Sequence, residues 1–325
     1  MFTTLPAEIF EAIVDAIPCS RDIFTLRLVC RQFAVALEPK LDYIYISAPS
    51  QHHSLWSHLA MHPHFARHVR TLRIVAENRL PRGFSPFDSR RVNTRLPVDL
   101  ETTTFCQALR WMIDLRALQW GCDDTVPHFL GDGIWTTLRR SCPRLSELGV
   151  VDFRAGDFNT LDAVGDGSAS HTWIYKSKIF DLSNLTQFSM VSGVMEILEE
   201  QEDGLDTEPL TRFLLRCPNL EILAVFFQSM GWSSPPSFDN IFTNANWSRL
   251  KVLSFNNITC SSSVFSAFVR RHPSIETLHG VDNLFLPIPW ASIEHDSLPN
   301  LREFRGPLAG IKAVGASNAP VEVTA

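Results

Sequence analysis

The sequence predicts an α/β fold in which a short helical segment precedes a row of helix–strand repeats. Three observations support this prediction: a recurring apolar pattern, a helical stretch before several of its copies, and an N-terminal region without the pattern. The pattern is Φ-x-x-Φ-x-Φ, where Φ is apolar, and its copies begin at positions 69, 115, 145, 185, 220, 250, 275 and 301. Spacings of about 20 to 50 residues are typical of solenoids, in which each unit packs against its neighbours.

Each repeat is expected to consist of a helix, a proline stop and a short strand. The last part of the pattern alternates apolar and non-apolar residues, as a strand with one buried face does. Helical stretches come just before several copies, and they are "WSHLAMHP", "WTTLRRSCP", "LTRFLLRCP" and "SAFVRRHP". The proline ends each helix because it disfavours helical geometry in the residue before it. In the last two copies, Gly280 and Gly306 replace the final apolar residue.

Cys142 and Cys217 both stand directly before a proline stop, which raises the question of redox or metal chemistry. The chain has seven cysteines but no C-x-x-C spacing, and another repeat carries His272 in the same position. A disulfide framework is typical of small secreted chains, and this chain has 325 residues. We therefore interpret both cysteines as small buried residues at helix ends.

These repeats resemble the leucine-rich-repeat family in an irregular form, over residues 65–310. The solenoid is expected to span residues 47–310 with eight or so units and loop insertions near 76–100 and 231–240. The family's asparagine after the strand is matched only by Asn283, so a regular curvature is not implied. Residues 311–325 are expected to be a C-terminal tail or a truncated repeat, in which "APVEV" is a candidate further strand.

Residues 1–46 are expected to form a separate helical domain. The stretch "LPAEIFEAIVDAI" aligns apolar residues at four-residue steps, and "RDIFTLRLVCRQFAVAL" places a second apolar stripe on one helix. The stretch "LDYIYI" then predicts a first short strand. Helices of this size cannot bury all these apolar residues among themselves, so a partner helix or protein is implied.

This region is similar to the F-box in the order and spacing of several residues. They are Leu5-Pro6, Glu8-Ile9, Ile13, Asp22-Ile23, Leu26, "LVCRQF" at 28–33, and Pro39 to Leu41. The resemblance implies that the box docks on a Skp-type adaptor protein. The residues implied to form the box core and its adaptor surface are Leu5, Pro6, Ile9, Ile13, Leu26, Val29, Cys30 and Phe33. The sequence does not divide them between internal packing and contact.

An F-box followed by irregular repeats resembles receptor families of basidiomycete fungi. The resemblance implies a substrate-recognition subunit of a Skp/cullin/F-box ubiquitin ligase, linked through the adaptor to a cullin-RING ligase. Such a subunit is not an enzyme and needs no cofactor; it contributes proximity and orientation. The alternative is an interaction scaffold whose F-box is not used for ubiquitin transfer. A third class, an enzyme or a helix-turn-helix DNA binder, lacks both an active-site constellation and a basic recognition helix.

A protein substrate is expected to bind where strand residues point away from the core. Residues on either side of the second Φ take that direction, because side chains alternate along a strand. These outward positions are polar or charged in the first and last repeats and apolar in the middle. An apolar centre with a polar rim is typical of binding surfaces. The predicted substrate-binding residues are Val191, Ile222, Ala224, Phe226 and Val252; the alternative is that an inserted loop covers them.

Composition and charge argue against several other classes of protein. The net charge of −6 gives no general reason to expect nucleic acid or an anionic membrane as a partner. No stretch approaches the ~18 uninterrupted apolar residues of a membrane span. The N-terminus carries Glu8, Glu11 and Asp15 and no basic region, which predicts a cytoplasmic or nuclear protein. His58 and His62 have a spacing that can bind zinc, but no further ligand joins them, so no metal is expected.

Overall fold

The computed structural model describes two compact units, and we take each by itself. The first comprises Met1–Trp120 and Thr136–Leu145, and the second Gly121–Trp135 and Ser146–Ala325. The described residues are 6–17, 22, 25–26, 28–29, 33–34, 37, 43–50, 52–75, 98–122, 133–152, 177–192, 207–227, 235–281, 290, 293–294, 297–307, 310–312 and 322–324. Among them, no helix has the length and apolar character that crossing a membrane requires.

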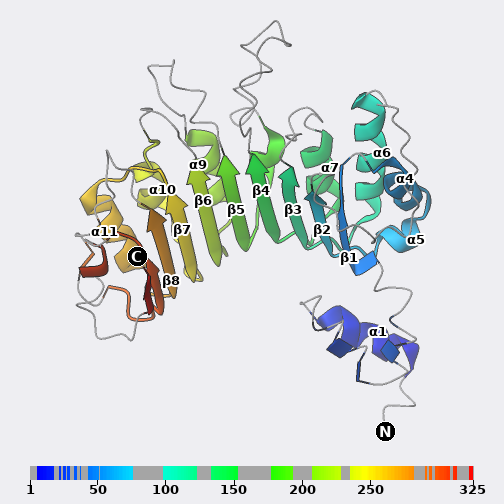
Figure 1. Cartoon of the computed structure of the whole chain (residues 1–325), viewed down its shortest axis with the longest axis horizontal. Coiled ribbons are helices and arrows are strands. Elements are labelled where there is room, and N and C mark those ends of the chain that lie inside the picture. The colour runs from blue at the N-terminus through cyan, green and yellow to red at the C-terminus, as the bar shows by residue number, and fades with distance from the viewer. Residues whose placement is uncertain are drawn as a thin grey trace, which may run out of the picture. The chain divides into compact units, whose positions relative to one another are not determined.

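The second unit is a stack of helix–strand repeats. Its strands are β4 (Glu147–Asp152), β5 (Gln187–Ser192), β6 (Ile222–Phe227), β7 (Val252–Asn256), β8 (Thr277–Val281), β9 (Glu303–Arg305) and β10 (Glu322–Thr324). Each strand pairs in parallel with the next one along the chain, and Figure 1 shows β4 to β8 pointing the same way. Its helices are the 3-10 helix η4 (Lys178–Asp181), α9 (Glu208–Leu215), α10 (Asp239–Asn244) and α11 (Ser262–Arg271).

The first unit contains the N-terminal helix and the earliest repeats. Its elements are α1 (Ala7–Ala16), β1 (Tyr45–Ala48), α4 (His53–Met61), α5 (Pro63–Ala66), β2 (Thr71–Val75) and α6 (Val98–Trp111). β3 (Ala117–Cys122) and α7 (Gly133–Ser141) each begin in one unit and end in the other. β1 pairs with β2 in parallel. Trp56 of α4 meets Phe105 of α6 edge-on, with ring centroids 4.7 Å apart.

The predicted fold class is confirmed: a short helical segment precedes an irregular α/β solenoid of helix–strand repeats. All eight copies of the apolar pattern form strands, β2 to β9. Side chains alternate between buried and partly exposed along β5 and β6, as the pattern predicts. The domain limits 1–46, 47–310 and 311–325 stay predictions.

A regular backbone arrangement joins successive repeats without the family's asparagine. The carbonyl two residues before the second Φ accepts two N–H groups from the next repeat. Ser146 O accepts from Thr186 N at 2.8 Å and from Gln187 N at 3.0 Å, and Glu221 O accepts from Lys251 N at 2.8 Å and from Val252 N at 3.1 Å. These backbone groups are thereby satisfied inside the stack.

The helix-end position before the proline stop is buried in three repeats, which confirms the interpretation of its cysteines. Cys142, Cys217 and His272 are all buried. Cys142 Sγ donates to Leu109 O at 3.6 Å, and burial raises the pKa of its thiol to about 12. His272 Nδ1 lies 2.7 Å from Phe268 O, so it donates there, while Nε2 accepts from Trp247 N at 2.9 Å. Position, not reactivity, explains why these residues recur.

Gly280 has a packing role that its sequence pattern does not show. A Cβ at this position would lie 2.3 Å from Cζ2 of Trp290. Trp290 stacks on Phe255 at a centroid distance of 5.6 Å and an interplanar angle of 14°. The indole therefore fills the space that the last apolar residue of the pattern fills in other repeats.

Three local expectations differ from the structure. The stretch 21–37 is not one continuous helix, because Leu28 and Val29 lie in a turn whose N–H groups donate to Thr25 O and Leu26 O, three residues back. The segment 235–240, expected in a loop, buries Phe238 against Phe227 and Phe242 and begins α10. Likewise, α6 begins at Val98, inside the insertion expected near 76–100. The candidate strand near the C-terminus exists as β10.

Candidate functional site

The N-terminal helices have a small core of their own. Val14, Phe33, Leu37 and Ile44 are buried together, and Ile17 and Leu26 pack against them while partly exposed. Phe33 and Leu26, two of the predicted adaptor-contacting residues, are therefore packing residues of this core. The cluster has four buried members, which are too few to cover every apolar side chain of this region.

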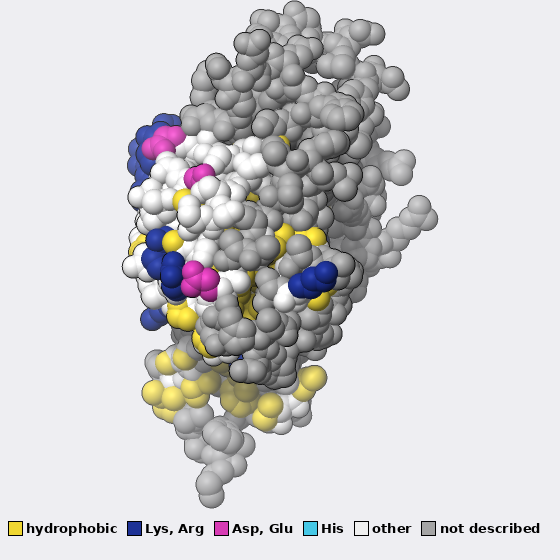
Figure 2. All heavy atoms as spheres, turned by 90° about the vertical axis from the view of Figure 1, so that its left-hand side faces the viewer, with side chains coloured by type: hydrophobic (Ala, Val, Ile, Leu, Met, Phe, Trp, Pro, Cys, Tyr) yellow, Lys and Arg dark blue, Asp and Glu magenta, His cyan; other side chains and the backbone are white. Residues whose placement is uncertain are grey.

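Apolar side chains remain exposed on the same helices. The exposed fractions are 48% for Ile9, 36% for Ile13, 84% for Leu28 and 63% for Val29. These four residues are called the box surface below, and Figure 2 shows apolar side chains gathered at the lower end of the view. Pro6 is exposed as well, whereas Leu5 and Cys30 lie outside the described residues. Several exposed apolar residues around one small core indicate a protein interaction surface.

Leu28 is the member of the box surface that sequence reasoning missed. A continuous helix over 21–37 was expected, and its apolar stripe passes through Leu26 and Phe33 without Leu28. The observed turn at Leu28 and Val29 presents both side chains to solvent. The available signal was the pair of adjacent apolar residues, which cannot both lie on one stripe of a helix.

Arg70 links α1 to the first repeats. Its guanidinium Nη1 donates to Val14 O at 3.1 Å and to Ile17 O at 3.2 Å. These carbonyls belong to the C-terminal end of α1, which attracts cations through the helix dipole. Arg70 is buried, and its backbone N–H donates to Ile44 O at 3.0 Å. One residue thus holds the end of α1 and the start of the strand stack.

The five predicted substrate-binding residues do lie on one face of the sheet. Strand register places Ile222 beside Val252 and Phe226 beside Val191, with Ala224 between the two rows. All five side chains are partly exposed, while the alternate residues of β5 and β6 are buried. The set Val191, Ile222, Ala224, Phe226 and Val252 is called the sheet patch below. No described segment buries it fully.

Charged residues occur on the same face at both ends of the second unit. Glu147 of β4 is in register with Gln187, which is in register with Ile222 of the patch. At the other end, Glu303 Oε1 lies 2.8 Å from Arg305 Nη2 and 3.3 Å from His279 Nε2. The histidine is within ion-pair distance but is not aligned for a hydrogen bond, so this buried nitrogen has no hydrogen-bond partner. The patch therefore has a polar rim.

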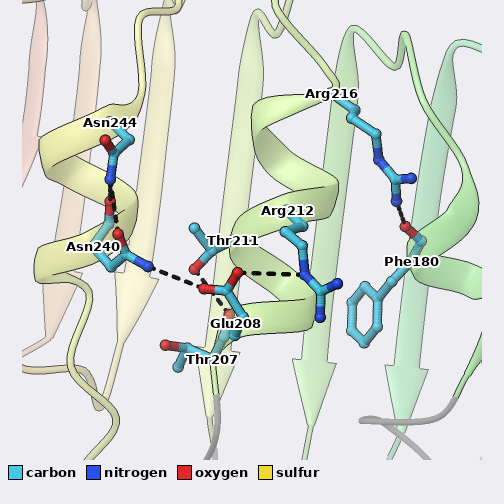
Figure 3. Close-up of polar contacts among 8 residues, drawn as sticks. All are labelled: Phe180, Thr207, Glu208, Thr211, Arg212, Arg216, Asn240 and Asn244. Carbon is cyan, nitrogen blue, oxygen red and sulfur yellow. Dashed lines mark hydrogen bonds and ion pairs between the residues drawn. The ribbon is translucent and has the colours of Figure 1, made fainter.

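The helical face of the second unit carries exposed polar ties between repeats (Figure 3). Glu208 of α9 accepts from Asn240 Nδ2 at 3.2 Å and pairs with Arg212 Nε at 3.4 Å. Arg216 donates to the carbonyl of Phe180 in the preceding repeat. Exposed pairs of this kind contribute little stability each. The Glu208–Arg212 pair lies within α9, and the other two contacts join neighbouring repeats.

The histidines near the first repeat form an aromatic cluster. The rings of His58 and His62 have centroids 4.5 Å apart, and Tyr43 Oη lies 3.2 Å from His58 Nε2. Burial, with added repulsion from His62 and His64, lowers the pKa of His58. Among the described residues, no group of three or more His, Cys, Asp or Glu could hold a metal ion. Most of the insertion expected near 76–100 lies outside the described residues.

Comparison with known proteins gives little beyond this geometry. No protein-family model matches the chain, and no curated protein matches its sequence. Among solved structures, the chain is similar to the crystal structure of the Rad7 and Elc1 complex in yeast, at 11% identity and a TM-score of 0.43. The alignment covers 97% of this chain and 82% of that chain. A likeness of this degree assigns no residue and no activity to the present chain.

Proposed function

We propose that this chain is the substrate-recognition subunit of a Skp/cullin/F-box ubiquitin ligase. The observation that carries the proposal is the box surface: Ile9, Ile13, Leu28 and Val29 are exposed in the segment whose sequence resembles the F-box. Apolar side chains left uncovered by a small core favour a permanent partner, and a Skp-type adaptor is the partner that the resemblance implies.

The proposed mechanism needs no chemistry from the chain itself. The box surface binds the adaptor, the sheet patch binds a protein substrate, and the assembled ligase brings ubiquitin close to lysines of that substrate. The contribution to rate is proximity and orientation. The chain is accordingly proposed to be non-enzymatic, to use no cofactor and to act in the cytoplasm or the nucleus.

The alternative is an interaction scaffold that binds the adaptor without ubiquitin transfer. It requires the same box surface and the same sheet patch, so binding experiments do not separate it from a ligase subunit. Deletion of residues 1–45 separates the two functions. After the deletion, a captured partner protein becomes longer-lived in cells only if the box directs its ubiquitination.

Adaptor binding is tested with the double substitution Ile9→Asp and Val29→Asp in the full chain. Two charges on an apolar contact are expected to weaken binding to a purified Skp-type adaptor about 100-fold, equivalent to about 2.7 kcal/mol. The matched control is Met61→Asp, because Met61 is an apolar residue of the same unit with 69% exposure outside the box. Titration calorimetry measures both; equal binding by the double variant and the wild type contradicts the proposal.

Substrate binding is tested separately with Ile222→Asp. A charge in the sheet patch is expected to lower capture of partner proteins about tenfold, or about 1.4 kcal/mol, and to leave adaptor binding unchanged. The measurement is quantitative affinity capture with adaptor binding recorded on the same sample. Loss of both activities indicates misfolding, and unchanged capture places the substrate elsewhere.

A further inference from the structure

Glu147 is an unpaired carboxylate on the face that carries the sheet patch. It lies on β4, and successive register pairs connect it to Gln187, Ile222 and Val252 in one row across the strands. Its side chain is partly buried, and burial raises the pKa of its carboxyl. Within the part of the chain that the structure describes, its carboxylate has no hydrogen bond and no ion pair.

Glutamates at or directly before the strand starts of later repeats in the second unit are paired. Glu221 has Lys251 at 3.0 Å, Glu276 has Arg302 at 3.4 Å, and Glu303 has Arg305 at 2.8 Å. Each partner comes from the next repeat or from the same strand. Glu147 has no such partner: Gln187 stands beside it in the next repeat, and Gly149 stands two residues later in its own strand. A partly desolvated carboxylate without a cation is unfavourable, and a ligand cation would remove that cost.

We infer that Glu147 receives a basic side chain of the bound protein, so that the sheet patch selects an extended segment with a lysine or arginine near an apolar anchor. This inference rests on the proposed function, because it assigns a substrate class to the same face. A lone carboxylate suits an ammonium or a guanidinium group, which forms charge-assisted hydrogen bonds with it. A metal ion is not favoured, since no described group of three ligating side chains exists there.

The spacing of strands sets the spacing of the recognised residues. Glu147 and Ile222 are two strands apart, which is about 10 Å at the usual strand separation. An extended peptide advances about 3.3 Å per residue, so the basic residue lies about three positions from the apolar residue that contacts Ile222. The expected ligand is therefore an extended peptide with an apolar residue for Ile222, a short spacer and one basic residue for Glu147.

The test uses the full chain bound to its adaptor and an array of synthetic ten-residue peptides. Every peptide has a fixed central leucine in an alanine–serine background, and one other position is Lys, Arg, Gln or Glu in turn. We expect Lys or Arg about three positions from the leucine to bind at least tenfold more tightly than Gln. Glu147→Gln should remove this difference, while Glu221→Gln, which changes a glutamate already paired with Lys251, should keep it.

Each outcome decides the inference. No preference for a basic residue, or a preference that survives Glu147→Gln, overturns it. Peptides that bind through leucine alone leave the sheet patch in place and reject only the role of Glu147. Failure of every peptide rejects the inference and the patch together, while adaptor binding, measured in parallel, shows whether the box proposal stands. Loss of thermal stability in Glu147→Gln would show that the carboxylate is structural, which also overturns the inference.

Discussion

The N-terminal helices and the repeats of the second unit differ in how completely they bury their apolar side chains. The helices bury a cluster that includes Val14 and Phe33 but leave Leu28 and Val29 in solvent. The later repeats bury even their largest side chains, among them Phe255 and Trp290. The difference follows from size: short helices cannot enclose their own apolar surface, whereas stacked repeats enclose one another's.

This contrast separates two kinds of candidate interface. The box surface exposes whole apolar side chains and depends on a partner to cover them. The sheet patch exposes only parts of Ile222 and Phe226, because the neighbouring strands already flank both residues. The first surface suits a constant partner, and the second suits substrates that are bound and released.

The largest expected effect comes from emptying the core of the last repeats. Trp290 packs between Phe255, Phe265 and Phe304 at centroid distances of 5.5 to 5.6 Å. Trp290→Ala should lower the free energy of unfolding by about 3–5 kcal/mol, since the cavity cannot collapse fully. Urea unfolding measures this loss.

The control for this substitution is Trp111→Ala, which removes the same side chain from a position that is 46% exposed. It should change stability by less than about 0.5 kcal/mol. Adaptor binding without denaturant should be retained in both variants, because neither tryptophan belongs to the N-terminal core of Val14, Phe33, Leu37 and Ile44. Similar losses in the two variants would mean that the tryptophan does not support the later repeats.

Much of the fold could be predicted because repeats encode it many times. Each copy of the pattern carries its own apolar alternation, and several carry a proline stop, so one weak copy does not obscure the repeat pattern. The sheet patch was also predictable, because alternation decides which side chains leave the core. Its five residues lie on one face, as expected.

The remaining features depend on contacts between distant residues. Gly280 makes its copy of the apolar pattern incomplete, and the packing of Trp290 against this position explains why a glycine stands there. The sequence suggests only that Arg70 is a charged residue before a strand, yet its guanidinium donates hydrogen bonds to carbonyls 53 and 56 residues earlier in the chain. The unpaired state of Glu147 depends on which residue the next repeat places beside it. No local pattern carries this information.

A smaller effect is expected at the end of α1, inside the first unit. Arg70→Met removes two hydrogen bonds from a buried guanidinium to the end of α1, which should cost about 2 kcal/mol. Hydrogen exchange of the α1 amides should then quicken about 30-fold, with the amides of β6 and β7 unchanged. Arg302→Met is the control, because Arg302 has the same place in its repeat but forms an exposed pair with Glu276. Equal exchange in α1 for both variants would remove Arg70 as the link.

The smallest expected effect is the loss of stability at acid pH that comes from His272, the residue before the proline stop of its repeat. Burial lowers the pKa of His272, whose neutral ring accepts the N–H of Trp247. Because the folded state resists protonation, the unfolded chain takes up the proton first as the pH falls below about 6.5, and stability is lost there. Between pH 7.5 and 5.5 this loss should be about 1 kcal/mol in thermal unfolding.

The chain itself offers the matched variant for this test. His272→Cys introduces the residue that Cys142 and Cys217 carry at the same position. Their thiols stay neutral at acid pH, since burial raises their pKa. Other histidines titrate equally in both proteins, so the difference between the two pH profiles belongs to His272. The variant should lose about 1 kcal/mol less than the wild type on acidification; identical profiles would show that the Trp247 contact does not depend on the neutral ring.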